Sequence, residues 1–120
     1  MGVRALFLIV ALAATQLGGP AIAGQVGERH LTAANPTAAT RDAEHRDTVR
    51  VTVWYPAAPD AREVSLDIGP PARPLFKVGS AAPDAGFADD RRRPVILFSH
   101  GFGGTARMMA WFMLPLARAG

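Results

Sequence analysis

The stretch Arg92–Thr105, RRPVILFSHGFGGT, says more about the fold than any other part of the chain. Within it, Val95–Ser99 is almost entirely apolar and begins with two β-branched side chains. Such a run is typical of a strand buried on both faces in a parallel α/β sheet. The next segment, His100–Gly104, contains three glycines, which allow a tight turn. The stretch therefore predicts a central strand, a glycine turn and then a helix.

The residues after the turn predict a helix with Thr105 as its N-cap, running to about Arg118. Gly120 lies where a helix commonly ends. Pro115 has no N–H to donate to the carbonyl of Trp111, so it should kink or shorten the last turn. The expected buried stripe of this helix consists of Met108, Met109, Phe112, Leu116 and Ala119.

A second strand is predicted over Thr48–Tyr55, where β-branched and aromatic residues alternate with polar ones. Pro56 should end this strand because proline donates no ladder hydrogen bond. Residues 57–93 are rich in proline and charge and predict a long surface insertion, with one short extended piece at Val64–Ile68. Residues 24–45 form a polar N-terminal segment in which Gly27–Thr32 is a possible edge strand.

Residues 1–23 have the pattern of a cleavable secretory signal peptide. Arg4 supplies the positive start, Ala5–Ala14 the apolar centre, and Ala21-Ile22-Ala23 a small-x-small cleavage site before Gly24. The alternative is a membrane anchor, but the apolar run is about half of the roughly 20 residues that a span needs. We therefore expect a secreted or periplasmic protein, cut near Ala23 and without a stable membrane span.

The net charge of +3 and the absence of cysteine narrow the classes of function. The arginines of this chain, such as Arg91–Arg93 after Asp89-Asp90, are interspersed with acidic residues and form no basic stripe with aromatics. We therefore expect no nucleic-acid partner. Without cysteine the chain forms no disulfide. The histidines and carboxylates show no metal-ligand spacing, so no metal and no cofactor are expected.

A glycine turn between a strand and a helix suits the chemistry of acyl transfer. The tetrahedral intermediate of that reaction carries a negatively charged oxygen, which fixed backbone N–H donors stabilise. Glycine lets the backbone approach such an oxygen closely, and the N-terminus of the following helix adds positive potential. The turn at His100–Gly104 is therefore a candidate oxyanion site.

Three segments together resemble the N-terminal part of α/β-hydrolases. They are VTVWYPA (Val51–Ala57), PVILFSHGFGG (Pro94–Gly104) and the helix ending in LARAG (Leu116–Gly120), after a variable insertion at 57–93. The nearest likeness is to dienelactone-hydrolase-like and platelet-activating-factor-acetylhydrolase-like esterases. The resemblance covers residues 46–120 and implies an α/β fold whose first strands, oxyanion loop and first helix are present here. It also implies a secreted serine hydrolase of small-molecule carboxylic esters.

The resemblance assigns roles to the residues of the turn. The backbone N–H of Phe102 would be an oxyanion donor, Gly101 and Gly103 would permit the turn, and His100 and Gly104 would support the loop. Trp54 and Tyr55 are expected to serve packing and not substrate contact.

The catalytic triad itself is not expected within these residues. In the hydrolase order the serine comes first, then the acid, then the histidine, and His30 and His45 precede the turn. None of Ser65, Ser80 and Ser99 stands in a G-x-S-x-G elbow. The resemblance also places a fourth strand between the second and third, so Val95–Ser99 would lack both neighbours. We therefore expect the 120 residues alone to be inactive and prone to aggregation.

Two alternatives stay open. Gly101–Ala106 also fits G-x-G-x-x-A, the dinucleotide-binding fingerprint, although a histidine precedes its first glycine. The second alternative is that the chain is a secreted fragment or binding module without catalytic activity. The preferred acyl group is not indicated by any residue of the sequence.

Overall fold

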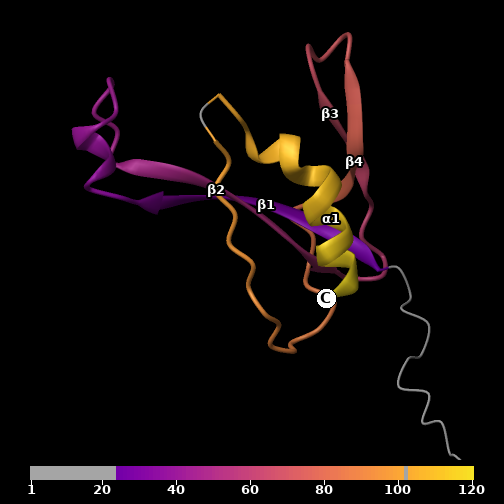
Figure 1. The fold of residues 1–120 in the computed structure, drawn as a ribbon. Helices are drawn as coiled ribbons and strands as arrows, with labels where there is room; N and C mark the ends of the chain where they lie inside the picture. The colour runs from indigo at the N-terminus through magenta and orange to yellow at the C-terminus, as the bar shows by residue number, and fades with distance from the viewer. Residues whose placement is uncertain (1–23, 102) are drawn as a thin grey trace, which may run out of the picture.

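The computed structural model describes residues 24–101 and 103–120, so the predicted signal peptide and Phe102 lie outside the described residues. Four strands form one mixed sheet: β1 (Gln25–Ala34), β2 (Thr48–Ala57), β3 (Val64–Ile68) and β4 (Phe76–Pro83). A short 3₁₀ helix, η1 (Ala38–Thr40), lies between β1 and β2. A second, η2 (Ala106–Met109), leads directly into α1 (Ala110–Ala119). In Figure 1, α1 lies across one face of the sheet while the two hairpins project beyond it.

The order of strands in the sheet is β2-β1-β4-β3. β1 and β2 pair antiparallel over their whole length, from Gln25 opposite Ala57 to Ala34 opposite Thr48. β3 and β4 form a second antiparallel hairpin, and β4 joins β1 in parallel through only two residue pairs. The predicted strand at Gly27–Thr32 is therefore present, but the expectation that it is an edge strand is wrong. It is interior because the hairpin made by the insertion covers its free side.

The predicted strand at Thr48–Tyr55 is confirmed, and it continues through Pro56 to Ala57. The carbonyl of Pro56 accepts a hydrogen bond from Ala88 N–H at 2.9 Å. In a strand the N–H and C=O of one residue point to the same side, so the proline nitrogen also faces away from β1. Proline is tolerated here because β2 is the edge strand and this position loses no bond to β1.

The insertion at 57–93 is more ordered than the sequence indicates. The short extended piece at Val64–Ile68 is β3, as predicted, but β4 is an additional strand. Its sequence, FKVGSAAP, contains glycine, alanine and proline and shows no clear alternation. The ladder also shifts register between Leu66 and Asp67, which is a bulge. A strand of this composition is stabilised by its two neighbours and not by its own propensity.

The core lies between the sheet and α1. Val26, Leu66 and Ala81 from three strands pack against Ala110 and Leu114 of the helix, with Trp54, Val78 and Ala117 at the margin. The predicted helix over Thr105–Arg118 is confirmed as η2 and α1 together, and Gly120 caps it through its N–H to the carbonyl of Ala117. The helix continues for four residues beyond Pro115, so the last turn is not shortened.

The predicted buried face of the helix is wrong. Ala110, Met113 and Leu114 are buried, whereas Met108 and Phe112 remain about half exposed, at 50% and 45%. The helix carries large apolar residues around most of its circumference, so the periodicity of its sequence does not determine which face is buried. The buried face is the one that fits the surface of the sheet, where Leu114 lies directly over Gly79 of β4.

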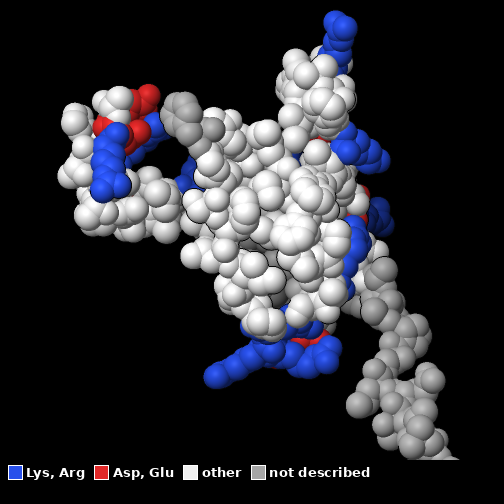
Figure 2. Space-filling view, in the orientation of Figure 1, with Lys and Arg blue, Asp and Glu red and all other residues white. Residues whose placement is uncertain are grey.

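The expected central strand over Val95–Ser99 does not form. These residues belong to no helix or strand, and Val95 and Leu97 are 91% and 90% exposed. No backbone hydrogen bond joins Pro94–Ser99 to any other described residue. A strand exists only with a partner, and the described sheet offers this segment none. Trp111 of α1 is also exposed, at 63%. In Figure 2 the central face of the molecule is mostly white, with charged side chains mainly at its margins.

An exposed, unpaired apolar segment should drive association between copies of the chain. We expect the chain to self-associate and the variant Leu97→Lys to be predominantly monomeric in sedimentation velocity. Leu75→Lys, which adds the same charge at another exposed leucine, is the control and should leave association unchanged. A monomeric wild-type chain with a cooperative thermal transition would contradict this prediction.

Gly79 should be required for the packing of α1. Its φ is +147°, and a Cβ added there would collide with Leu114 Cδ1. Gly79→Ala should lower the free energy of unfolding by about 3 kcal/mol through overpacking and backbone strain. Gly86→Ala is the control, because nothing lies within 4 Å of its added Cβ. Urea unfolding of the two variants in the Leu97→Lys background measures their free energies of unfolding. Equal midpoints for Gly79→Ala and Gly86→Ala would show that α1 can move away from Gly79 without loss of stability.

Candidate functional site

The glycine turn is held by two hydrogen bonds to one carbonyl. The carbonyl of Gly101 accepts from Gly104 N–H and from His100 Nδ1, each at 3.0 Å. Gly103 has φ +75°, the left-handed region that favours glycine. Thr105 is extended, with φ −135° and ψ 157°, and the chain then enters η2. The turn therefore leads directly to the N-terminus of the helical segment, as the sequence predicts.

The turn is also tight around Gly104. A Cβ added at this residue would lie 3.1 Å from the carbonyl oxygen of Gly101 and 3.3 Å from both Cβ and Nδ1 of His100. By contrast, nothing lies within 4 Å of a Cβ at Gly101 or Gly103. A side chain at Gly104 would therefore crowd the turn, and Gly103 is favoured for its left-handed backbone conformation.

The predicted oxyanion donor, Phe102, lies outside the described residues, so its N–H is not placed. The structure brings the other four predicted residues together: His100, Gly101, Gly103 and Gly104 form the turn and its support. Thr105 is the N-cap of η2, but its side chain makes no capping hydrogen bond. No carbonyl of the described residues accepts from the N–H of Gly103 or Thr105. The turn thus presents backbone donors beside the start of a helix, an arrangement that suits an anionic oxygen.

The far end of α1 is tied to the sheet by a partly buried ion pair. Arg118 Nη2 donates to Glu63 Oε2 at 2.7 Å, and its Nη1 donates to the carbonyl of Gly24 at 2.8 Å. Glu63 also accepts from Val26 N–H at 2.8 Å and from the hydroxyl of Ser80. The Glu63 side chain is only 12% exposed, so its charge is compensated almost wholly by protein groups.

These contacts set the direction in which the pKa of Glu63 moves. Burial alone would raise the pKa of this carboxyl. The hydrogen bonds from Arg118, Ser80 and Val26, together with the charge of Arg118, outweigh burial and hold the pKa of Glu63 below its ordinary value. The carboxylate is therefore ionised at neutral pH and stabilises the docked helix.

A second buried carboxylate, Glu28 of β1, was not found by sequence reasoning. Its Oε2 accepts from the indole N–H of Trp54 at 2.7 Å, and its Oε1 lies 3.3 Å from Arg107 Nη2 and 3.1 Å from His30 Nε2. The Glu28 side chain is 8% exposed. The one available signal was a glutamate inside the possible strand Gly27–Thr32, a segment too weakly patterned to assign a face.

The serines and histidines form no catalytic triad among the described residues. Ser65 donates to Asp67 and Ser80 to Glu63, and no imidazole contacts any serine. His45 Nδ1 lies 3.2 Å from the carbonyl of Ala39 in the β1–β2 connection. His30 lies between the hydroxyl of Thr52 and Glu28, a cross-strand polar contact. Tyr55 is buried against Phe87 and donates to the carbonyl of Ala85, so the expected packing role of Tyr55 is confirmed.

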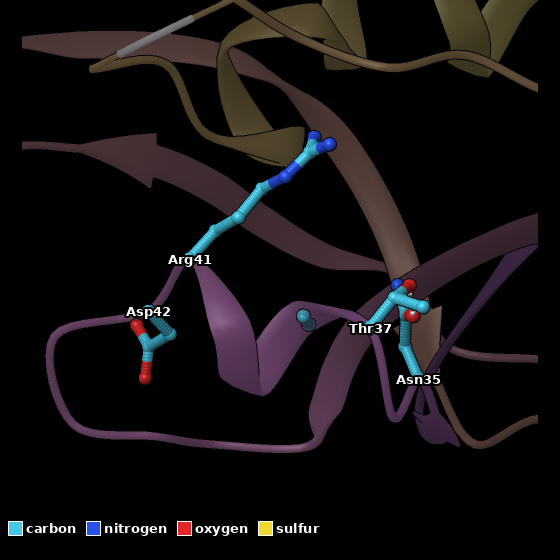
Figure 3. Close-up of a pocket in the computed structure, with 5 residues that line it drawn as sticks. Asn35, Thr37, Arg41 and Asp42 are labelled. Atoms are coloured by element: carbon cyan, nitrogen blue, oxygen red, sulfur yellow. Dashed lines mark hydrogen bonds between the residues drawn. The ribbon is translucent and has the colours of Figure 1, made fainter.

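An open hollow lies away from the turn, beside η1. It measures about 570 Å³, is open to solvent, and is lined by Asn35, Thr37, Ala38, Arg41 and Asp42. Thr37 donates to Asn35 at 2.8 Å, and Arg41 extends away from Asp42 (Figure 3). Hydrogen bonds from Arg46 lower the pKa of Asp42 to about 2. These exposed contacts shape the β1–β2 connection and do not converge on one point.

Residues 24–101 and 103–120 contain no group of three or more histidine and carboxylate side chains arranged to hold a metal ion. Within the same ranges, no helix is both long enough and apolar enough to cross a membrane.

The ion pair between Glu63 and Arg118 should make stability depend on pH. Because the folded pKa of Glu63 is lowered, the unfolded state binds its proton first as the pH falls. The contribution of Glu63 is therefore complete above about pH 4.5, the ordinary value, and is lost as the pH falls through the lowered pKa. Glu63→Gln should cost about 2 kcal/mol at pH 7 and progressively less in acid.

Urea unfolding between pH 3 and 7 measures this effect. Glu44→Gln is the matched control, because its carboxylate is 72% exposed and makes one 3.4 Å contact with Arg46. A difference between wild type and Glu63→Gln that stays constant with pH would show that folding does not lower the pKa of Glu63.

Comparison with known proteins identifies no relative of this chain. No family model matches the chain, and neither a curated protein nor a solved structure matches it.

Proposed function

We propose that this chain supplies the oxyanion loop of a secreted serine hydrolase that acts on small carboxylic esters. The observation that carries the proposal is the turn at His100–Gly104. It combines a left-handed Gly103, a carbonyl of Gly101 held by two donors, and N–H groups of Gly103 and Thr105 that donate to no carbonyl of the described residues. A turn of this kind stabilises a negatively charged oxygen without reorganisation, which is the main requirement of acyl transfer.

The charge around the turn is compatible with this role. Among the described neighbours of the turn in sequence, from Arg91 to Ala119, there is no acidic residue, whereas Arg107 and Arg118 follow the turn. A developing oxyanion would therefore meet no fixed negative charge from this segment. His100 is occupied with the carbonyl of Gly101, which supports a bracing role for this residue and not proton transfer.

The proposal places the nucleophilic serine, the acid and the histidine base outside these 120 residues. Two unpaired backbone edges support this: Pro94–Ser99, and the outer side of β2 between Thr48 and Tyr55, neither of which pairs with another described residue. The resemblance to α/β-hydrolases expects one strand between these two edges. Such a strand would convert the exposed apolar segment into an interior strand that ends at the glycine turn.

The first experiment is to determine the reading frame beyond codon 120 in the source DNA. A G-x-S-x-G elbow followed by an acid and a histidine, in that order, would support the hydrolase. A stop codon directly after Gly120 would contradict the enzyme assignment and leave a fragment without catalysis.

In the protein that carries the elbow, Phe102→Pro removes one backbone N–H and should lower ester turnover by about 10²–10³-fold. Phe102→Ala is the matched control, because it removes the ring and keeps the N–H, and turnover should stay close to wild type. Hydrolysis of p-nitrophenyl acetate at saturating substrate is the measurement. Equal turnover in the two variants would exclude the N–H of Phe102 from the oxyanion site.

The dinucleotide alternative gives a different result in a separate assay. Binding of NAD to the 120-residue chain in calorimetry, lost in Gly103→Val, would support a phosphate-binding turn and contradict the hydrolase. The hydrolase proposal expects no heat of binding.

A further inference from the structure

We infer that Glu28 is a positioning residue for the glycine turn and acts on it through Arg107. The inference rests on the proposed function, because it names what holds the oxyanion loop in place. Glu28 belongs to β1, and Arg107 belongs to η2, three residues after Gly104. The contact between them spans 79 positions of sequence and is the most direct polar link between the sheet and the start of the helical segment.

The geometry of the link suits a fixed tether. Arg107 Nη2 reaches Glu28 Oε1 at 3.3 Å, while its Nη1 lies 3.5 Å from the carbonyl of Asp67 on β3. One guanidinium thereby touches two strands of the sheet. The planar fork of arginine holds such a pair of acceptors in a defined direction, which a lysine ammonium does not.

The carboxylate is itself immobilised. Its second oxygen accepts from Trp54 Nε1–H at 2.7 Å, and Trp54 packs at the margin of the core. His30 completes the cluster, with Nε2 at 3.1 Å from Glu28 Oε1 and Nδ1 at 3.2 Å from Thr52 Oγ1. The ring of His30 thus bridges Glu28 on its own strand and Thr52 on β2. A carboxylate held in this way defines the position of the arginine that binds it.

Apart from the contacts of Arg107 with Glu28 and with the Asp67 carbonyl, no polar contact ties the turn to the sheet among the described residues. The ion pair of Arg118 with Glu63 lies at the opposite end of α1, and Leu114 on Gly79 lies between them. The hydrogen bond of Gly104 N–H to the Gly101 carbonyl within the turn, and that of Met108 N–H to the Thr105 carbonyl at the start of η2, are both local. Without the contact of Arg107 with Glu28, the turn would keep only the 3.5 Å contact of Arg107 with the Asp67 carbonyl, and its internal hydrogen bonds would open more often.

The test is amide hydrogen exchange in the full chain, with Gly104 N–H and Met108 N–H as reporters. Glu28→Gln keeps an acceptor for Trp54 and removes the charge that binds Arg107. It should raise exchange at both reporters by about tenfold, while Leu75 N–H, which bonds to Ile68, stays unchanged. Arg107→Met, at a side chain that is 40% exposed, is a second variant that keeps the apolar stem and should give the same result.

Three controls separate positioning from general stability. Arg107→Lys should recover part of the protection, and Glu28→Gln with Arg107→Met should be no worse than either alone. His30→Gln removes a different contact to Glu28 and should leave both reporters unchanged. Unchanged reporters in Glu28→Gln and Arg107→Met, or a uniform increase over all amides, would overturn the inference.

Ester turnover in the complete protein distinguishes this inference from the proposed function. If both hold, Arg107→Met lowers kcat and leaves KM nearly unchanged, because the anchor acts on the oxyanion and not on substrate binding. Local exchange changes in a protein without esterase activity would support positioning by Glu28 and contradict the hydrolase.

Discussion

The contact of Leu114 with Gly79 is the constraint on which the rest of the structure depends. A helix approaches a sheet this closely only where a residue without a side chain faces it, and Gly79 provides that space at a bulge in the β3–β4 ladder. The position of Leu114 then sets which face of α1 is buried. It also brings Arg118 to Glu63 at one end of the helix and Arg107 to Glu28 at the other. The glycine turn, which precedes the helix, is placed by these same contacts.

The two buried carboxylates have distinct physical roles. Glu63 is surrounded by donors from three elements, and this surplus lowers its pKa and locks the C-terminal end of α1 to the sheet. Glu28 shares its oxygens between Trp54, His30 and Arg107, so it links the rigid β1–β2 pair to the segment that follows the turn. In each case the paired arginine offsets part of the desolvation cost of the buried carboxylate. Each carboxylate also fixes the helical segment relative to the sheet.

In contrast to the buried and paired carboxylates, the apolar segment Val95–Phe98 is exposed and unpaired among the described residues. Its side chains are those of a core strand, yet the described sheet offers no backbone partner and the residues remain in solvent. This exposure predicts association between copies of the chain, and the segment also has a free backbone edge that leads directly into the turn. The proposed hydrolase function accounts for both properties, because a neighbouring strand would bury the segment and orient the turn at its end.

Local chemistry allowed several features to be predicted from the sequence. The alternation in β2, the extended piece at Val64–Ile68, the glycine turn, the helix and its cap at Gly120 all follow from propensities within a few residues. The resemblance to α/β-hydrolases remains a proposal that also comes from the sequence. Phe102, its central residue, lies outside the described structure.

Only the tertiary structure decided the features that need a distant partner. β1 is interior because β4 covers it, β4 is a strand because two neighbours pair with it, and Val95–Ser99 is not a strand because none does. The buried face of α1 followed from Gly79, and the links from Glu28 to Arg107 and from Glu63 to Arg118 join residues 79 and 55 positions apart. The physical reason is common to all: hydrogen bonding and burial are properties of pairs, and a single segment of sequence contains only one member of each pair.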